Sequence, residues 1–163
     1  MQYGFDALSL MPTSLHGPGV NYHPTYSHAL PALSRRLHGA QAHAPSATRW
    51  GIGFPLRELL HVDDLGEACV FSLEHWQPGP DDHPRLVVGM GVDLTILELA
   101  EAVAAVMGYQ SEIHWDASKP DGTPQKQLNV HRLAVLGWRA RIPLSEGLTS
   151  TVADFADRGS ERL

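Results

Sequence analysis

The chain has 163 residues, of which 43% are hydrophobic and 18% charged. This composition excludes a disordered or fibrous protein, and the length suits one ordinary hydrophobic core. Twelve basic and eighteen acidic residues give a formal net charge of −6, which argues against nucleic acid as a partner.

Three features of the sequence predict a cytoplasmic protein. The longest apolar stretch, Ile96 to Met107, contains Glu98 and Glu101 and falls short of the roughly 20 apolar residues that a membrane span needs. The first residues show no basic segment followed by an apolar one, so no secretory signal is expected. The one cysteine, Cys69, cannot form an internal disulfide, which suits a reducing compartment.

The first half of the chain predicts strands and helices in alternation. Residues 5–11 form an apolar run that ends at Pro12 and predict a buried strand, and the turn-rich residues 12–19 predict a loop. The segments that follow predict, in order, a helix at 28–43, strands at 48–50 and 58–62, and a helix at 63–75 capped by Asp63.

The second half continues the alternation after a loop at 77–84. It predicts a strand at 85–88, a helix at 96–107, a strand at 111–115, a polar loop at 116–127, a short helix from Asn129 to Leu136 and a last helix at 145–155. Thr95 and Glu98 form a capping box, and Gly108 ends that helix. With no repeats and no long linker, the pattern predicts a single α/β domain over residues 1–163.

Two common functional signatures are missing from the sequence. No Gly-x-Gly-x-x-Gly follows a strand and opens a helix, and the nearest match, Gly89-Met90-Gly91, is better interpreted as a tight turn. No Tyr-x-x-x-Lys pair is present, and the histidines from His16 to His43 show no ligand spacing within a helix, so no metal site is expected.

Positive residues are nevertheless placed where they could line an anionic pocket despite the acidic total. They are Arg35, Arg36, Arg49, Arg57, Lys119 and Lys126.

Three stretches carry the strongest functional signal: residues 11–18 continuing to 26–36, residues 50–64, and residues 116–126. Together they resemble the extended short-chain dehydrogenase/reductase family, and within it the GDP-L-fucose synthase branch. The resemblance covers essentially the whole chain but only the second half of a family member. It implies the carboxyl-terminal part of an extended Rossmann-type fold: the substrate-binding region with the last strands and helices of the cofactor sheet. The amino-terminal NADP-binding half would precede Met1.

The resemblance also assigns roles near the cofactor. His28 matches the histidine that acts as general acid during epimerisation and lies near the nicotinamide. Pro12, Thr13, Ser14 and Leu15 match the loop that runs past the nicotinamide of NADP. Taken alone, a histidine at this position would be a helix cap or a surface residue.

Five residues match the substrate side of the family's site. Arg36 and Arg57 match residues that bind the nucleotide sugar, which agrees with a diphosphate's need for permanently charged donors. Trp50 matches a substrate-contacting residue, and Asp121 and Lys126 match loop residues that meet the GDP end. Without the resemblance, the arginines would be solvated surface residues and Trp50 a core residue.

Some positions depart from the family pattern. Ser14 and His16 stand where the family usually has asparagine and tyrosine, and Asn129 replaces an aspartate. The Gly-rich cofactor loop, the Ser-Tyr-Lys set and the cysteine base of the family would all precede Met1. Cys69 is expected to be buried in a helix and inert, so it does not replace that base.

By family resemblance, we predict an NADP-dependent enzyme that carries out 3,5-epimerisation and 4-reduction of GDP-4-keto-6-deoxy-D-mannose. This chain would supply the GDP-sugar site of that enzyme and would be inactive in isolation. Alternatives stay open: a non-catalytic GDP-sugar-binding module, one half of a split enzyme with a separately encoded amino-terminal half, a fragment without function, or another nucleotide-sugar epimerase/dehydratase. The expected partner is a GDP-sugar, with neither nucleic acid nor membrane, and a homodimer is left open.

Overall fold

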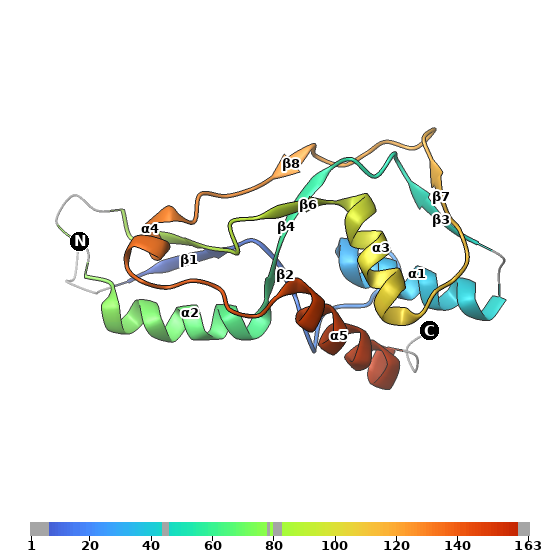
Figure 1. Cartoon of the computed structure of the whole chain (residues 1–163). Helices are drawn as coiled ribbons and strands as arrows, with labels where there is room; N and C mark the ends of the chain where they lie inside the picture. Colours follow the sequence, from blue (N-terminus) through green and yellow to red (C-terminus); the bar gives the residue numbers. More distant parts are fainter. Residues whose placement is uncertain (1–6, 44–45, 78, 80–82, 160–163) are drawn as a thin grey trace.

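In the computed structural model, strand β4 (Leu56–His61) runs between two groups of elements at opposite ends of the molecule (Figure 1). The structure describes residues 7–43, 46–77, 79 and 83–159. The other strands are β1 (Ser9–Pro12), β2 (Ser14–His16), β3 (Ala47–Trp50), β5 (Arg85–Val88), β6 (Asp93–Thr95), β7 (Ile113–Asp116) and β8 (Gln125–Lys126). The helices are α1 (Ala29–His43), α2 (Val62–His75), α3 (Ile96–Met107), α4 (His131–Val135) and α5 (Leu144–Asp154), which continues as a π-helical turn, Phe155–Gly159.

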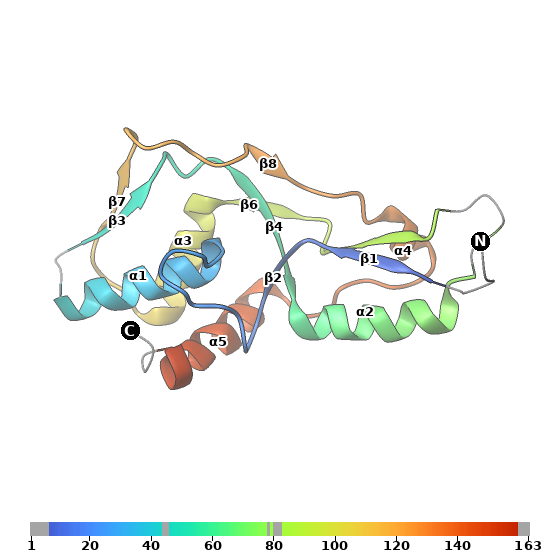
Figure 2. The same ribbon diagram turned by 180° about the vertical axis from the view of Figure 1, so that it is seen from behind.

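Strand pairing is mostly parallel. Strand β4 pairs with β2 and β8 in parallel and with β6 in antiparallel orientation, while β1 pairs with β5 and β3 with β7, both in parallel. Helices α1, α3 and α5 gather at one end, and α2 and α4 at the other, as both views show (Figures 1 and 2). The predicted α/β class is confirmed.

Two hydrophobic cores meet at β4. One contains Leu59 and the buried leucines of α1, α3 and α5, and the other contains Leu60 with the buried residues of β5, α2 and α4. Successive side chains of a strand point to opposite faces, so two adjacent leucines can serve different cores. Leu59 is 6% exposed and Leu60 is fully buried.

The ends of α3 agree with the prediction, because its capping residues lie directly beside the helix in the sequence. The Thr95–Glu98 capping box is confirmed, with the Glu98 N–H donating to Thr95 Oγ1 at 3.0 Å and the Thr95 N–H to Glu98 Oε2 at 2.7 Å. Gly108 ends α3 with a φ of 66°. The prediction that Asp63 caps α2 is wrong, because His61 occupies the N-cap and its Nδ1 accepts the Asp63 N–H.

Three short strands were missed. Strand β2 lies inside the predicted loop 12–19, β8 lies inside the predicted loop 116–127, and β6 ends at Thr95, the N-cap of α3. All three pair with β4. A strand of two or three residues is specified by its partner more than by its own composition, so local patterns do not reveal it.

The first strand is more exposed than the predicted buried strand. Strand β1 begins at Ser9, and the predicted residues 5 and 6 lie outside the described residues. Leu8 and Leu10 are half-buried, and Met11 is 44% exposed. Among the described strands, only β5 pairs with β1, so its other edge has no described partner.

Cys69 is half-buried in α2, so the expectation that it is buried is wrong. Within the described ranges, no helix is both long and apolar enough to cross a membrane.

Two buried histidines join β2, β4 and α5. His16 and His61 are register partners at the ends of their strands, and their rings pack edge to face with centroids 5.3 Å apart. His16 Nδ1 lies 3.4 Å from Thr151 Oγ1, and His61 Nε2 lies 3.2 Å from Ser150 Oγ. A Cβ at position 147 would clash with the His16 ring, so Gly147 permits this close approach of α5.

The open edge of β1 predicts self-association of the isolated chain. Unpaired strand edges beside exposed apolar side chains favour pairing with another chain. We expect the chain to bind hydrophobic dyes and scatter light, and Met11→Lys to reduce both signals, because a charge on the edge opposes pairing. The control is Leu73→Lys, which places the same charge on α2 at a leucine that is 80% exposed and leaves the β1 edge unchanged. A parent protein that is monomeric and dye-silent contradicts the prediction.

Buried His16 predicts a loss of stability in acid. Burial lowers its pKa from 6.5 to about 4, and His61 adds to the effect, while the Gly147 backbone and Asp64 oppose it. The unfolded chain therefore takes up this proton first, and stability falls as the pH drops from about 6.5 to 4. A shift of this size corresponds to about 3 kcal/mol.

The measurement is urea unfolding at pH 7, 5 and 4. His16→Gln should flatten the fall in unfolding free energy between pH 7 and pH 4. The control, His114→Gln, changes an exposed ring and should leave the fall unchanged. Parallel pH profiles for the parent and His16→Gln would show that another group titrates.

Candidate functional site

A groove of about 770 Å³ lies where β1, β2, the start of α1 and β8 converge. Its walls include all five residues predicted to face the cofactor: Pro12, Thr13, Ser14, Leu15 and His28. The segment from Gln125 to Leu128, which contains the predicted substrate residue Lys126, also lines it. Sequence motifs more than 100 residues apart thus form one concave surface.

A smaller cavity of about 70 Å³ brings together His28, Arg57 and Lys126, with Ser14 and Leu15 beside them. The predicted general acid, an arginine predicted to bind the nucleotide sugar and a lysine predicted to meet the GDP end therefore share one site. Because His28 lies directly before α1 and its carbonyl accepts the Ala32 N–H at 3.0 Å, the first turn of the helix fixes its backbone.

Arg57 connects the strand to the polar loop. Its Nη1 donates to the carbonyls of Leu56 at 2.6 Å and Thr123 at 2.8 Å. The carboxylate of Asp121 accepts the Ile52 N–H at 3.1 Å, which fixes the loop at a second point. Arg57 is half-buried and Asp121 is exposed.

Trp50 lies in a cationic cluster and is not a core residue. Its side chain is 60% exposed, and the Arg36 guanidinium carbon and the Lys119 Nζ lie 6.0 and 5.9 Å from its ring centroid. Arg36 Nη1 also donates to the Thr48 carbonyl at 3.4 Å. A cation over an indole face is favourable even at the surface.

Arg49 adds an unsatisfied donor beside this cluster. Burial lowers its pKa to about 10, with a further contribution from the nearby Arg36 charge. Its Nε is buried and has no hydrogen-bond partner in the part of the chain that the structure describes. A bound anion would relieve both the repulsion and the missing hydrogen bond.

The predicted site is therefore divided into two parts. The groove and the small cavity hold Pro12 to Leu15, His28, Arg57 and Lys126, while Trp50, Arg36 and Asp121 line neither of them. Arg57 links the two parts, because it lines the small cavity and also bonds to the loop that carries Asp121.

Thr13 offers the groove a free hydroxyl. Its Oγ1 is buried and has no partner among the described residues, and the side chain lines the groove. Buried hydroxyls are normally hydrogen-bonded, so an orphan in a groove wall is suited to a ligand.

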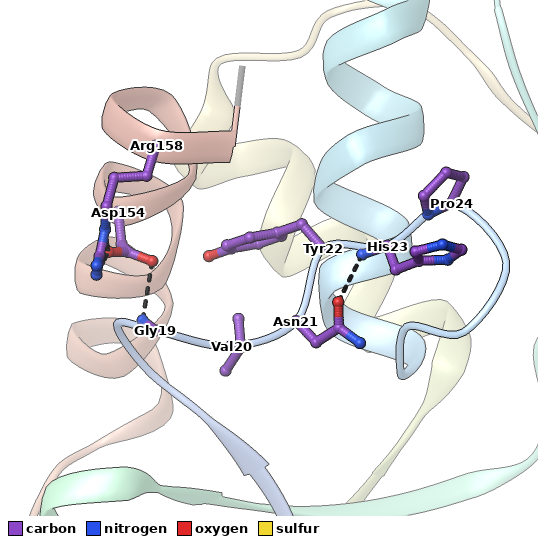
Figure 3. A pocket seen from close by; sticks show the side chains of 8 residues that line it. All are labelled: Gly19, Val20, Asn21, Tyr22, His23, Pro24, Asp154 and Arg158. Atoms are coloured by element: carbon purple, nitrogen blue, oxygen red, sulfur yellow. Dashed lines mark hydrogen bonds and ion pairs between the residues drawn. The ribbon is translucent and has the colours of Figure 1, made fainter. Parts of the chain in front are cut away.

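A second pocket of about 240 Å³ is lined by residues 19–24, by Asp154 at the end of α5 and by Arg158 (Figure 3), and it shares Gly19, Val20 and Asn21 with the groove. The Gly19 N–H donates to Asp154 Oδ2 at 2.9 Å, Arg158 pairs with the same carboxylate, and the Tyr22 hydroxyl donates to the Thr151 carbonyl at 2.8 Å. Burial raises the pKa of Tyr22, and the Asp154 charge adds to the rise. These contacts fix residues 18–21, which also line the groove.

Sequence reasoning missed several residues of the site. Gln127, Leu128, Val20 and Asn21 line the groove, although none of them lies in the three marked stretches, and Gln125 lies in one of these stretches but was given no role. Their only signal was proximity to matched positions. Lys119 was noted only among the cations that could line an anionic pocket, and its place over Trp50 depends on the pairing of β3 with β7. Among the described residues, no group of three histidine, cysteine or acidic side chains could hold a metal ion.

Residues 1–89 match the NAD dependent epimerase/dehydratase family. Together with the fold, this match shows that the chain belongs to that family.

The chain is also similar in sequence to individual proteins named GDP-L-fucose synthase. The chain is 49% identical to the probable GDP-L-fucose synthase 1 of Oryza sativa subsp. japonica, over 93% of this chain and 45% of that protein. It is also 49% identical to the GDP-L-fucose synthase of Escherichia coli (strain K12), over 96% of this chain and 50% of that protein. The chain thus spans about half the length of the curated relatives it matches.

Solved structures support the fold. Two structures of a GDP-L-fucose synthetase from Naegleria fowleri, the second bound to NADP, give TM-scores of 0.85 and 0.82 at 22% and 21% identity. Each match covers 94% of this chain, and 46% and 47% of the respective structures. The predicted Rossmann-type family fold is confirmed.

Proposed function

We propose that this chain provides the GDP-sugar site of an enzyme of the GDP-L-fucose synthase type, which acts on GDP-4-keto-6-deoxy-D-mannose. The observation that carries the proposal is the small cavity in which His28, Arg57 and Lys126 meet. A proton donor beside two cations suits a sugar attached to a diphosphate. The similar proteins named GDP-L-fucose synthase support this choice of substrate.

The binding chemistry follows from the two parts of the site. Arg57 and Lys126 face the diphosphate in the small cavity, while Arg36, Arg49 and Lys119 give the rim around Trp50 a positive charge. Fixed guanidinium groups can bind phosphate oxygens with two hydrogen bonds each. The exposed Trp50 ring offers an apolar surface to the ligand between these cations.

His28 acts as the general acid in the proposed epimerisation. The ketone of the substrate acidifies the neighbouring C–H bonds, so a base can remove a proton from one face and His28 can return one to the other. The base is proposed to lie in a part of the protein outside these 163 residues. The position of His28 in both the groove and the small cavity supports this role.

NADP fits the groove as the proposed cofactor, and when bound it would supply the hydride that reduces the ketone. Residues Pro12 to Leu15 would form the wall against the nicotinamide, with the orphan Thr13 hydroxyl as a hydrogen-bond donor. An amino-terminal half with the cofactor loop is the proposed partner, and the open edge of β1 supports such a partner.

The isolated chain is expected not to oxidise NADPH in the presence of GDP-4-keto-6-deoxy-D-mannose. Its sequence contains neither a Tyr-x-x-x-Lys pair nor the Gly-rich cofactor motif. The assay follows NADPH absorbance with the authentic ketosugar and a heat-treated control. Substrate-dependent turnover above that control would show that the 163 residues are a competent enzyme.

Arg57→Ala is expected to weaken GDP binding by roughly 10- to 150-fold, because a charge-assisted contact with phosphate contributes about 1.5–3 kcal/mol. Calorimetric titration with GDP measures the effect. The matched control is Arg141→Ala, whose exposed side chain pairs with Glu67.

Titration with UDP tests the nucleotide preference in the same experiment. Tighter binding of UDP than GDP would favour a UDP-sugar epimerase. Equal GDP affinity for the parent and Arg57→Ala would remove Arg57 from the binding site.

A further inference from the structure

Glu58 is a fully buried carboxylate in the middle of β4, next to Arg57. Its Oε1 accepts the Gly91 N–H at 2.6 Å, and its Oε2 accepts the Leu128 N–H at 3.4 Å. Within the described ranges, no cationic side chain pairs with it. A carboxylate is costly to bury, so its retention at this point indicates that the groups it binds must be held in place.

The Gly89-Met90-Gly91 turn is shaped to fit this carboxylate. A Cβ at position 89 would clash with Glu58 Oε1 and would lie 2.8 Å from Thr13 Cγ2. Gly91 has a φ of 80°, in the left-handed region that favours glycine, and in this conformation its N–H meets Glu58. The two glycines that did not form a cofactor motif thus accommodate the Glu58 side chain.

The same turn and Asp93, the first residue of β6, hold one wall of the groove. Gln127 Nε2 donates to the Gly91 carbonyl at 3.4 Å, and Gln125 Nε2 donates to Asp93 Oδ2 at 2.7 Å. Glu58 joins the turn to the segment from Gln125 to Leu128, because it accepts one N–H from Gly91 and one from Leu128. Lys126 lies between the two tethered glutamines.

We propose that Glu58 is a positioning residue that holds the segment from Gln125 to Leu128, and with it Lys126, against the groove. Glu58 does not line the groove itself and acts through the backbone of Gly91 and Leu128. Its effect on ligand affinity rests on the proposed function, whereas its effect on the segment does not.

Glu58→Gln tests the proposal with almost no change in side-chain size. The amide keeps one acceptor oxygen and places an N–H₂ group against the second backbone donor. We expect hydrogen exchange at the Leu128 or Gly91 amide to accelerate, and GDP affinity to fall, each by about 10-fold. The matched control is Glu67→Gln, which removes a surface ion pair and should change neither quantity.

A double-mutant cycle with Lys126→Met separates positioning from a general loss of stability. If Glu58 acts through Lys126, Glu58→Gln should weaken GDP binding by less than about 2-fold when Lys126 is already replaced. Full additivity of the two effects would overturn the proposal. Unchanged exchange at both amides in Glu58→Gln would overturn it as well.

A second variant, Gln127→Met, covers the case in which Glu58→Gln does not fold. Gln127 is exposed, so its replacement spares the core; it removes the tether to Gly91 and the 3.4 Å hydrogen bond that Gln127 Oε1 accepts from Gln125 Nε2. It should accelerate exchange at Leu128 and weaken GDP binding by about 3-fold, and unchanged values of both would count against the proposal. A parent chain that does not bind GDP would refute the proposed function, while the exchange measurement would still decide the role of Glu58.

Discussion

The alternation of side chains along β4 is the constraint on which the rest of the structure depends. Leu59 contributes to the core of α1, α3 and α5, and Leu60 to the core of α2, α4 and β5, so a single strand joins both cores. The residues directly before them, Arg57 and Glu58, serve the site: one reaches the small cavity and the other fixes the groove wall. Core packing and the geometry of the candidate site are thus coupled through adjacent positions of one strand.

The extent to which the fold could be predicted depended on how local its determinants are. Helix α3 was predicted to the residue because Thr95, Glu98 and Gly108 act within a few positions of its ends. The cap of α2 was assigned wrongly because His61 belongs to a strand that runs directly into the helix. Strands β2, β6 and β8 were missed because each depends on β4, a partner that is distant in the sequence.

The candidate site could be predicted in content but not in arrangement. Motif resemblance selected the residues that do converge, such as Thr13, His28 and Lys126. It could not show that Trp50 lies apart from them on a cationic rim, because its exposure depends on how β3 and the polar loop pack. Glu58 lies in the marked stretch 50–64 but was given no role, since its complete burial and its hydrogen bonds to Gly91 and Leu128 are visible only in the structure.

The contacts of α5 have a consequence for synthesis of the chain. Gly147 leaves room for the His16 ring, and Thr151 forms a hydrogen bond with it. Asp154 accepts a hydrogen bond from Gly19. The partners in each of these two hydrogen bonds are 135 residues apart in the sequence. Closing such a long loop is entropically costly and slow compared with forming local helices. On the ribosome, the loop that contains Gly19 therefore cannot reach its described position until α5 has emerged, and until then His16 and the apolar side of β2 are open to chaperones and to misfolding.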